Sequence, residues 1–221
     1  MAETLAADQD AHGAAFAHQF DDVEQQREAA TLGMWVFLAT EVMLFGGMLT
    51  VYTVYRYLYA RGFAEGSRQL DLWLGSINTV VLITSSLTMA IGVHGAQVGR
   101  RRMLVTSLVL TVLLGTIFLT IKGVEYAHKF EEGLVPGYDF TYAGPEAPHV
   151  ALFILLYFML TGVHALHMVI GIGAVSVVAY LGWRGRFGPA YHTPVELVGL
   201  YWHFVDIVWI FLLPLLYLLR H

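Results

Sequence analysis

The sequence predicts an all-α polytopic membrane protein, built as a bundle of five transmembrane helices. Of its 221 residues, 57% are hydrophobic and only 13% are charged, and the mean hydropathy is +0.62. Soluble domains contain about 25% charged residues, so this composition does not suit a protein surrounded by water. After a polar start, the chain divides into five apolar stretches, each long enough to cross the roughly 30 Å of hydrocarbon in a bilayer.

Residues 1–30 are predicted to form a polar arm before the transmembrane domain of residues 31–221. The arm lacks the basic start and the apolar core of a signal peptide, and we expect it to become helical around residues 21–28. We therefore expect it to lie at the membrane surface and to lead into the first span. Its acidic residues are Asp8, Asp10, Asp21, Asp22, Glu24 and Glu28.

The predicted spans cover about residues 31–57, 72–98, 103–128, 150–183 and 195–219. The longest loop, about residues 130–148, contains three of the six prolines in the chain. The fourth span is longer than the bilayer requires, so we expect it to tilt or to project beyond the membrane.

Basic residues in short turns predict the orientation of the chain. Three consecutive arginines at 100–102 follow the second span, and Arg184 and Arg186 follow the fourth. Short arginine-rich loops usually face the cytoplasm, which places the amino terminus in the cytoplasm and the carboxyl terminus outside. The density of charge in short loops decides this prediction, because the opposite side also carries basic residues: Arg56, Arg61, Arg68, Lys122, Lys129 and Arg220.

Glu41 is the acid of the first span and lies within an apolar stretch. Its carboxyl group is expected to be largely neutral, because desolvation disfavours the charged form. Two interpretations remain open. The residue handles protons or faces lipid, or it is a neutral acid that hydrogen-bonds to a neighbouring helix.

His164 and His167 lie three residues apart on the fourth span and therefore share a helix face. Histidine is the commonest metal ligand, but a haem held by two histidines needs a matching residue on a facing helix. His94, His128 and His203 are the candidates, and no second pair with a suitable spacing accompanies them. Interhelical hydrogen bonding, with each imidazole paired to a carboxylate or carbonyl, is therefore favoured.

The last span contains an acid, an imidazole and two indoles near the middle of the membrane. A carboxylate at this depth costs about 2.5–3.5 kcal/mol on insertion scales, so Asp206 needs a partner. His203 lies three residues before it, and we predict that the two form one polar couple. Trp202 and Trp209 share one side of the helix and, like Trp35 of the first span, suit packing or contact with lipid headgroups.

Small residues recur along the predicted spans. Small side chains allow membrane helices to approach closely, and we expect such contacts at Gly46, Gly47, Gly162, Ala165, Gly171, Gly173 and Ala174.

Short motifs on all five predicted spans carry a family resemblance. The last span contains Tyr201-Trp202-His203-Phe204-Val205-Asp206-Ile207-Val208-Trp209, and the fourth contains Thr161-Gly162-Val163-His164-Ala165-Leu166-His167-Met168. The first three spans contribute Phe37-Leu38-Ala39-Thr40-Glu41, Ile77-Asn78-Thr79 and Glu125-Tyr126. Taken in chain order, the five motifs resemble those of the subunit III family of haem–copper oxidases. The one difference noted is Thr40, which stands where the family's first-span motif has serine. The resemblance covers about residues 31–221.

The resemblance implies an accessory, non-catalytic subunit of a proton-pumping terminal oxidase, cytochrome c oxidase, in a bacterial inner membrane. In this family the haems and copper belong to subunits I and II. Subunit III packs on subunit I, binds phospholipid, and supports proton uptake and sustained turnover. The resemblance therefore implies no cofactor and no oxidase activity in this chain alone. Partners are expected to be subunit I, subunit II and other respiratory subunits, with the carboxyl terminus in the periplasm.

Two residues take their expected roles from the resemblance. Glu41 corresponds to the buried first-span acid of the family that carbodiimides label. Glu125 joins Glu41, the three histidines at 164, 167 and 203, and Asp206 as buried polar residues with structural or proton-linked roles. The longest family members carry two further amino-terminal helices, so we do not carry over the lipid sites that those helices form.

Several alternatives remain open. The chain also resembles subunit III of quinol oxidases and a related accessory protein of nitric oxide reductases. A different class is a b-type haem carrier that uses His164 or His167 with His203 or His94, and a third is a proton or ion transporter that uses Glu41 and Asp206. The absence of cysteine excludes disulfides, a covalent c-type haem and a thiolate-ligated copper centre within the chain, and no basic tract indicates nucleic acid.

Overall fold

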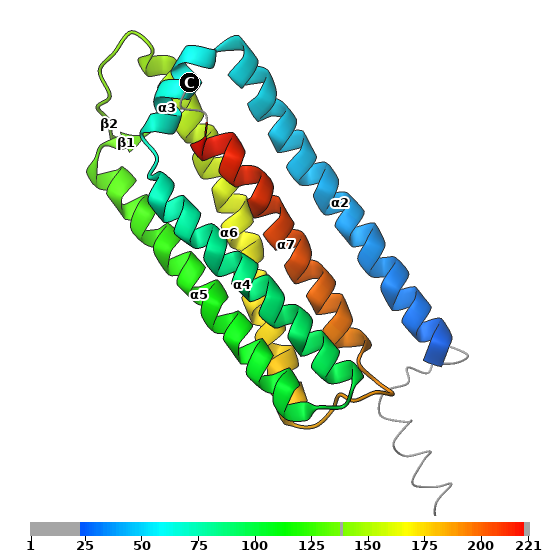
Figure 1. Cartoon of the computed structure of the whole chain (residues 1–221). Helices are drawn as coiled ribbons and strands as arrows, with labels where there is room; N and C mark the ends of the chain where they lie inside the picture. The colour runs from blue at the N-terminus through cyan, green and yellow to red at the C-terminus, as the bar shows by residue number, and fades with distance from the viewer. Residues whose placement is uncertain (1–22, 138, 219–221) are drawn as a thin grey trace, which may run out of the picture. The chain divides into compact units, whose positions relative to one another are not determined.

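The computed structural model describes residues 23–137 and 139–218, which are mostly helical (Figure 1). Five helices are long and apolar enough to cross a membrane: α2 (Val23–Leu58), α4 (Leu72–Gln97), α5 (Arg101–Glu131), α6 (Ala147–Trp183) and α7 (Thr193–Tyr217). The predicted all-α fold with five spans is therefore confirmed. A short helix, α3 (Ala60–Arg68), and two paired strands, β1 (Leu134–Val135) and β2 (Asp139–Phe140), complete the described elements.

The described residues divide into two compact units between Val42 and Met43. Of the predicted polar arm, residues 1–22 lie outside the described part, and residues 23–30 are helical and belong to α2. The first unit includes Trp35 and Glu41 of α2. The second unit includes the rest of α2 and all the elements that follow it.

Local signals explain where the helices of the second unit begin and end. The carboxylate oxygen Oδ1 of Asp71 accepts hydrogen bonds from the backbone N–H groups of Trp73 and Leu74, at 2.8 and 3.2 Å, and so caps the start of α4. The turn from α4 to α5 passes through Gly99, whose φ of +70° only glycine adopts readily. The guanidinium of Arg101 donates to the backbone carbonyl of Trp183, which ties this turn to the end of α6.

Helices α4, α5, α6 and α7 pack side by side in the second unit, each against two of the others (Figure 1). Large aromatic side chains fill the space between them, and Trp202, Trp209 and Phe118 are fully buried. The end of α2 joins this unit through Tyr52, whose hydroxyl donates to the backbone carbonyl of Leu215.

Trp202 is held between two helices that have no side chain at the point of contact. A Cβ on Gly115 of α5 would lie 2.7 Å from the indole, and one on Gly171 of α6 would lie 3.1 Å from it. The predicted close approach is therefore confirmed at Gly171. The prediction is wrong for Gly46, Gly47, Gly162 and Gly173, where no described atom lies within 4 Å of an added Cβ.

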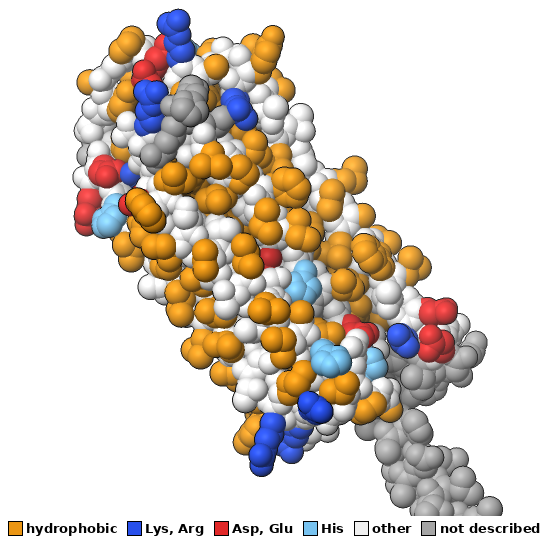
Figure 2. Space-filling model, in the orientation of Figure 1, with side chains coloured by type: hydrophobic (Ala, Val, Ile, Leu, Met, Phe, Trp, Pro, Cys, Tyr) orange, Lys and Arg blue, Asp and Glu red, His pale blue; other side chains and the backbone are white. Residues whose placement is uncertain are grey.

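The outer face of the second unit suits a lipid environment. Over α4, α5 and α7, Figure 2 shows mainly hydrophobic side chains. Large apolar residues such as Ile83, Leu87, Leu113 and Phe211 are more than half exposed. In a water-soluble protein such a continuous apolar face would be unusual, whereas lipid tails accommodate it.

Replacing Gly115 with alanine should destabilise the protein, because the new methyl group overlaps an indole that has no room to move. The expected loss is about 1–3 kcal/mol in the free energy of unfolding. Gly173→Ala on α6 is the matched control, since its methyl group meets nothing described, and alanine favours a helix by up to about 1 kcal/mol over glycine. The thermal unfolding midpoint in detergent compares the two variants. Equal midpoints would contradict the packing described for Trp202.

Candidate functional site

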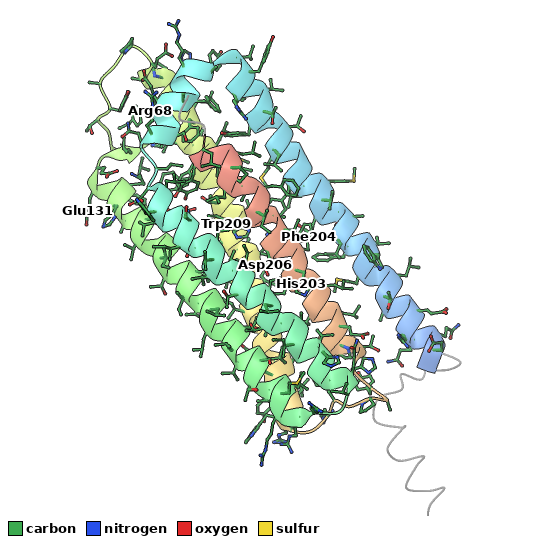
Figure 3. All side chains as sticks on the ribbon, viewed as in Figure 1. Arg68, Glu131, His203, Phe204, Asp206 and Trp209 are labelled. Atoms are coloured by element: carbon green, nitrogen blue, oxygen red, sulfur yellow. The ribbon has the colours of Figure 1, made fainter. Side chains whose placement is uncertain are left out.

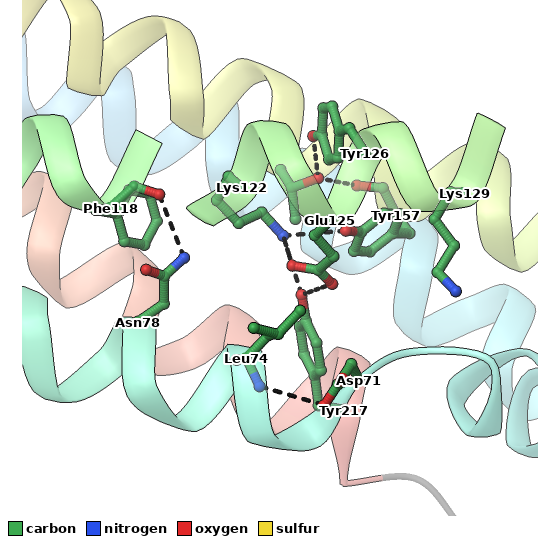
Figure 4. A network of polar contacts seen from close by, with 12 residues as sticks. Asp71, Leu74, Asn78, Phe118, Lys122, Glu125, Tyr126, Lys129, Tyr157 and Tyr217 are labelled. Atoms are coloured by element: carbon green, nitrogen blue, oxygen red, sulfur yellow. Dashed lines mark hydrogen bonds and ion pairs between the residues drawn. The ribbon is translucent and has the colours of Figure 1, made fainter. Parts of the chain in front are cut away.

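The most densely connected polar group in the described residues is a cluster around Lys122, which we call the lysine cage. It consists of Lys122, Glu125 and Tyr126 of α5, Tyr157 of α6, and Trp209 and Tyr217 of α7. The side chains of Lys122 and Glu125 are only 4% and 2% exposed. Figure 4 shows Lys122 and Glu125 pointing toward Tyr157 and Tyr217 from the facing helices.

Hydrogen bonds occupy every donor of the lysine ammonium. Nζ of Lys122 donates to Oε2 of Glu125 at 2.9 Å, to the Tyr157 hydroxyl at 3.0 Å and to the Tyr217 hydroxyl at 2.9 Å. The Tyr217 hydroxyl in turn donates to Oε1 of Glu125 at 2.6 Å. Both carboxylate oxygens are therefore bonded as well, which is the condition under which a buried ion pair is tolerated.

Four aromatic rings surround the same ammonium group. Nζ of Lys122 lies 4.9 Å from the centroid of Tyr157, 5.1 Å from that of Trp209, 5.4 Å from that of Tyr126 and 5.6 Å from that of Tyr217. The negative faces of aromatic rings attract a cation within about 6 Å. The cage can therefore hold a positive charge in surroundings that otherwise exclude it.

The cage connects three helices and borders the protein surface. The Tyr126 hydroxyl bonds to the Thr161 hydroxyl, which donates to the backbone carbonyl of Tyr157 at 2.6 Å. A polar hollow of about 360 Å³, between the start of α4 and the end of α5, is lined by Glu125 and Lys129 among others. Glu125 thus reaches both the cage and this hollow.

A second polar group lies on α7, next to α4 (Figure 3). Nδ1 of His203 forms a 2.7 Å hydrogen bond with the Ser86 hydroxyl of α4. Asp206 is 4% exposed, and neither of its carboxylate oxygens has a hydrogen-bond partner among the described residues. The prediction that His203 and Asp206 form one couple is wrong, because the imidazole bonds to serine on another helix.

The two histidines of α6 differ in their surroundings. Nδ1 of His167 pairs with the backbone carbonyl of Val163 at 2.8 Å, one turn earlier on the same helix, so this bond is not the interhelical one that the sequence predicts. Both ring nitrogens of His164 lack a partner in the described structure, so the predicted pairing is wrong for this residue. Its ring is 1% exposed and lies 5.6 Å from the ring of Phe118 and 5.3 Å from that of Trp209.

The packing at these histidines does not fit a haem. The rings of Phe118 and Trp209 occupy the space beside His164 that a haem bound to this residue would need. His203, a possible opposite ligand, has its Nδ1 bonded to Ser86. Across residues 23–137 and 139–218, no group of three or more histidines and acids is arranged to hold a metal ion.

The tryptophans of α7 are packing residues with bonded indole nitrogens. Nε1 of Trp202 donates to the Ser85 hydroxyl at 3.1 Å, and Nε1 of Trp209 donates to the Thr79 hydroxyl at 3.0 Å. Both side chains are fully buried. Of the two predicted roles, packing therefore applies to them, and contact with lipid headgroups does not. Trp35 lies on α2 in the first unit and is 58% exposed.

Comparison with known proteins decides the family. Residues 14–220 match the family model of cytochrome c oxidase subunit III. The chain belongs to the cytochrome c oxidase subunit III family. The resemblance carried by its motifs is therefore confirmed, and the five apolar helices make it a multi-pass membrane member of that family.

Its curated relatives carry two kinds of name. A cytochrome c oxidase subunit 3 of Corynebacterium diphtheriae is 33% identical over 195 residues, which cover 86% of this chain and 88% of the relative. One of Synechocystis sp. is 34% identical over 191 residues, covering 85% and 74%. A probable quinol oxidase subunit 3 of Staphylococcus epidermidis is 28% identical over 205 residues, covering 92% and 95%.

In this subunit III chain, the motifs of the second to fifth spans contact one another. Tyr126 of the third span bonds to Thr161 of the fourth, and the Tyr201 hydroxyl of the fifth donates to the backbone carbonyl of His167 at 3.1 Å. Trp209 reaches Thr79 of the second span. These motif residues thus form contacts between helices. Of the predicted acids Glu41, Glu125 and Asp206, Glu125 is the one that belongs to the lysine cage.

Four members of the cage are not among the site residues predicted from the sequence: Lys122, Tyr126, Tyr157 and Tyr217. The sequence predicts Lys122 among the basic residues on the outer side of the membrane, yet Lys122 is only 3% exposed. The spacing of Lys122 and Glu125, three apart on one helix, is a signal for an ion pair. Tyr157 and Tyr217 gave no comparable signal, because each lies in an apolar span far from Lys122 in sequence.

Removing one member of the buried ion pair should destabilise the chain more than removing both. Lys122→Met leaves the Glu125 carboxylate without its cation, and we expect a loss of about 3–5 kcal/mol in the free energy of unfolding. Combining it with Glu125→Gln should cost less than the sum of the two single changes. Unfolding in detergent mixtures by denaturing surfactant measures these differences.

A matched control is the exposed pair of Arg27 and Glu24, whose charged atoms are 3.9 Å apart at the same spacing of three residues. Arg27→Met should cost no more than about 1 kcal/mol. If Lys122→Met costs as little as Arg27→Met, or if the double change is fully additive, the ion pair does not stabilise the cage as described.

Proposed function

We propose that this chain is a cofactor-free accessory subunit of a terminal haem–copper oxidase in a bacterial inner membrane. The family match over residues 14–220 carries the proposal. In the complex, the chain packs on subunit I, has subunit II and other respiratory subunits as further partners, and itself performs no electron transfer. The haems and copper that reduce oxygen belong to those partner subunits.

The arrangement of polar side chains supports an accessory role. The charged atoms of the lysine cage are fully bonded within the chain, and the tryptophan nitrogens bond to serine and threonine hydroxyls. Such groups position helices rather than substrates. Packing at His164 also argues against the alternative of a b-type haem carrier, because aromatic rings fill the space that the macrocycle would need.

Cytochrome c is the proposed electron donor of the complex. Relatives named cytochrome c oxidase subunit 3 are 33% and 34% identical to the chain. Quinol is the second candidate, favoured by relatives named probable quinol oxidase subunit 3 at 28% and 31% identity. The donor binds to other subunits, so the same role for this chain follows in either complex.

Lipid binding and support of proton uptake complete the proposal. Exposed apolar side chains on α5 and α6, such as Leu113 and Leu166, suit bound phospholipid. Glu41, at the position of the family's first-span acid, is proposed to act in proton uptake or in sustaining turnover. The arginines of the α4–α5 and α6–α7 turns support an amino terminus in the cytoplasm and a carboxyl terminus in the periplasm.

Affinity purification of the tagged chain from its native membrane should recover haem-containing subunits and oxygen consumption. The chain produced without those partners should show no Soret absorbance and no oxidase activity, because it contributes no haem ligands. Absorption spectroscopy and an oxygen electrode measure both. A stoichiometric haem band in the isolated chain, or a native preparation without any haem-containing companion, would refute the proposal.

Glu41→Gln should leave assembly of the complex intact, because glutamine has a similar volume and keeps a polar side chain at this position. The expected change is in sustained turnover, seen as earlier loss of oxygen consumption during continuous activity. Glu24→Gln is the control, since Glu24 is an exposed acid on the same helix. Identical turnover and inactivation of the two variants would count against a proton-linked role of Glu41.

A further inference from the structure

A groove on the outer face of the second unit runs between α4 and α7. It has a volume of about 370 Å³ and a mainly apolar lining, which includes Ile83, Leu87, Ala90, Ile207 and Ile210. These residues come from two neighbouring helices only. We call this feature the α4–α7 groove.

Asp206 lines this apolar groove, as do His203 and Ser86. Asp206 is 4% exposed, and both of its carboxylate oxygens lack a hydrogen bond within the described chain. The Ser86 hydroxyl lies near the carboxyl group, but it is bonded to His203 at 2.7 Å. One hydroxyl has one proton to donate, so Ser86 can serve at most one of the two carboxyl oxygens.

The depth of Asp206 makes this deficit expensive. The residue lies near the middle of α7, a helix of 25 residues, where the bilayer contains no water to complete its bonds. Acidic residues at such depth almost always pair with another polar group. A polar group that enters the groove from another chain would supply the missing hydrogen bond.

A second groove on the same unit provides a comparison. It lies between α5 and α6, has a volume of about 410 Å³ and is lined by Val109, Leu113 and Ser176 among others. The Ser176 hydroxyl is bonded to the carbonyl of Ile172 on its own helix, and no acidic residue lines the groove. A lipid tail in the α5–α6 groove would leave no polar side chain of its lining without a hydrogen bond. A lipid tail in the α4–α7 groove would leave Asp206 without a partner.

We propose that the α4–α7 groove is the docking site for a transmembrane helix of another oxidase subunit, and that this helix brings a hydrogen-bond donor to Asp206. The proposal rests on the proposed function and adds to it the contact surface and the chemistry of the partner. Acyl chains have no donor, and headgroup donors lie at the membrane surface rather than at mid-depth. A second copy of this chain that met the same face about a two-fold axis would bring the same apolar rim and an identical carboxylate. It would therefore place two carboxylates together instead of bringing a donor to Asp206.

Photo-crosslinking in the intact complex tests the contact. A photoreactive amino acid replaces Leu87, which lines the groove and is 60% exposed, and the adducts are identified by mass spectrometry. The expected adduct is a transmembrane peptide of another subunit. Adducts with lipid alone, or with a second copy of this chain, would overturn the proposal.

Substitutions at Asp206 test the hydrogen bond. Asp206→Asn keeps an acceptor oxygen at the same place, whereas Asp206→Leu removes it. We expect the yield of the Leu87 adduct to fall about tenfold in the leucine variant and to change little in the asparagine variant. Equal adduct yields in the two variants would show that no donor reaches residue 206.

Filling the groove from its rim provides a test that leaves Asp206 in place, for the case that Asp206→Leu does not fold. Ala90→Trp adds an indole at an exposed position of the α4–α7 groove, and Val109→Trp adds one in the α5–α6 groove as the matched control. Ala90→Trp should lose the partner subunits during purification, while Val109→Trp should keep them. Retention of the partners by both variants would overturn the docking site.

The wild-type purification separates failure of this inference from failure of the proposed function. If the wild-type chain recovers haem-containing subunits but Ala90→Trp recovers them equally, only the groove assignment is wrong. If the wild-type chain recovers no such subunits, the proposed function itself is wrong.

Discussion

The buried ion pair of Lys122 and Glu125 is the interaction on which the packing of α5, α6 and α7 depends. An ammonium group inside a membrane bundle is tolerated only if every donor is bonded, and here the three acceptors come from all three helices. Tyr217 closes the arrangement by bonding to the carboxylate as well. Because each helix supplies a required partner, none of the three can rotate or slide without leaving a charged atom unpaired.

Polar contacts elsewhere in the second unit follow the same rule with neutral groups. Indole nitrogens of α7 donate to hydroxyls of α4, and Thr88 of α4 bonds to Thr111 of α5. Between membrane helices, apolar packing alone gives little specificity, since lipid tails are equally apolar. Hydrogen bonds at fixed depths therefore set the register of the helices, and the family motifs mark several of those depths.

The sequence predicts the number and type of the membrane-spanning helices, but it predicts neither the short helix α3 nor the partners of the polar residues. Long apolar stretches predict spans because a bilayer demands a certain length, and the Asp71 cap and the glycine turn at 99 mark two ends locally. Pairings depend on helices that are distant in sequence. His203 and Asp206 share a face, as their spacing requires, yet His203 finds its partner in Ser86, 117 residues earlier. Lys122 looked like an outer-surface residue because its acceptors, Tyr157 and Tyr217, lie in other spans.

The indole of Trp202 has a consequence for how this chain tolerates change. Its six-membered ring lies against the backbone at Gly115 of α5 and at Gly171 of α6, so the indole fills the space between these two helices at that level. Substitutions at the three positions are consequently interdependent. A smaller aromatic residue at 202 would make room for a side chain at 115 or 171, whereas replacing either glycine first would crowd the indole. We expect homologues that differ at one of these three positions to differ at the others as well.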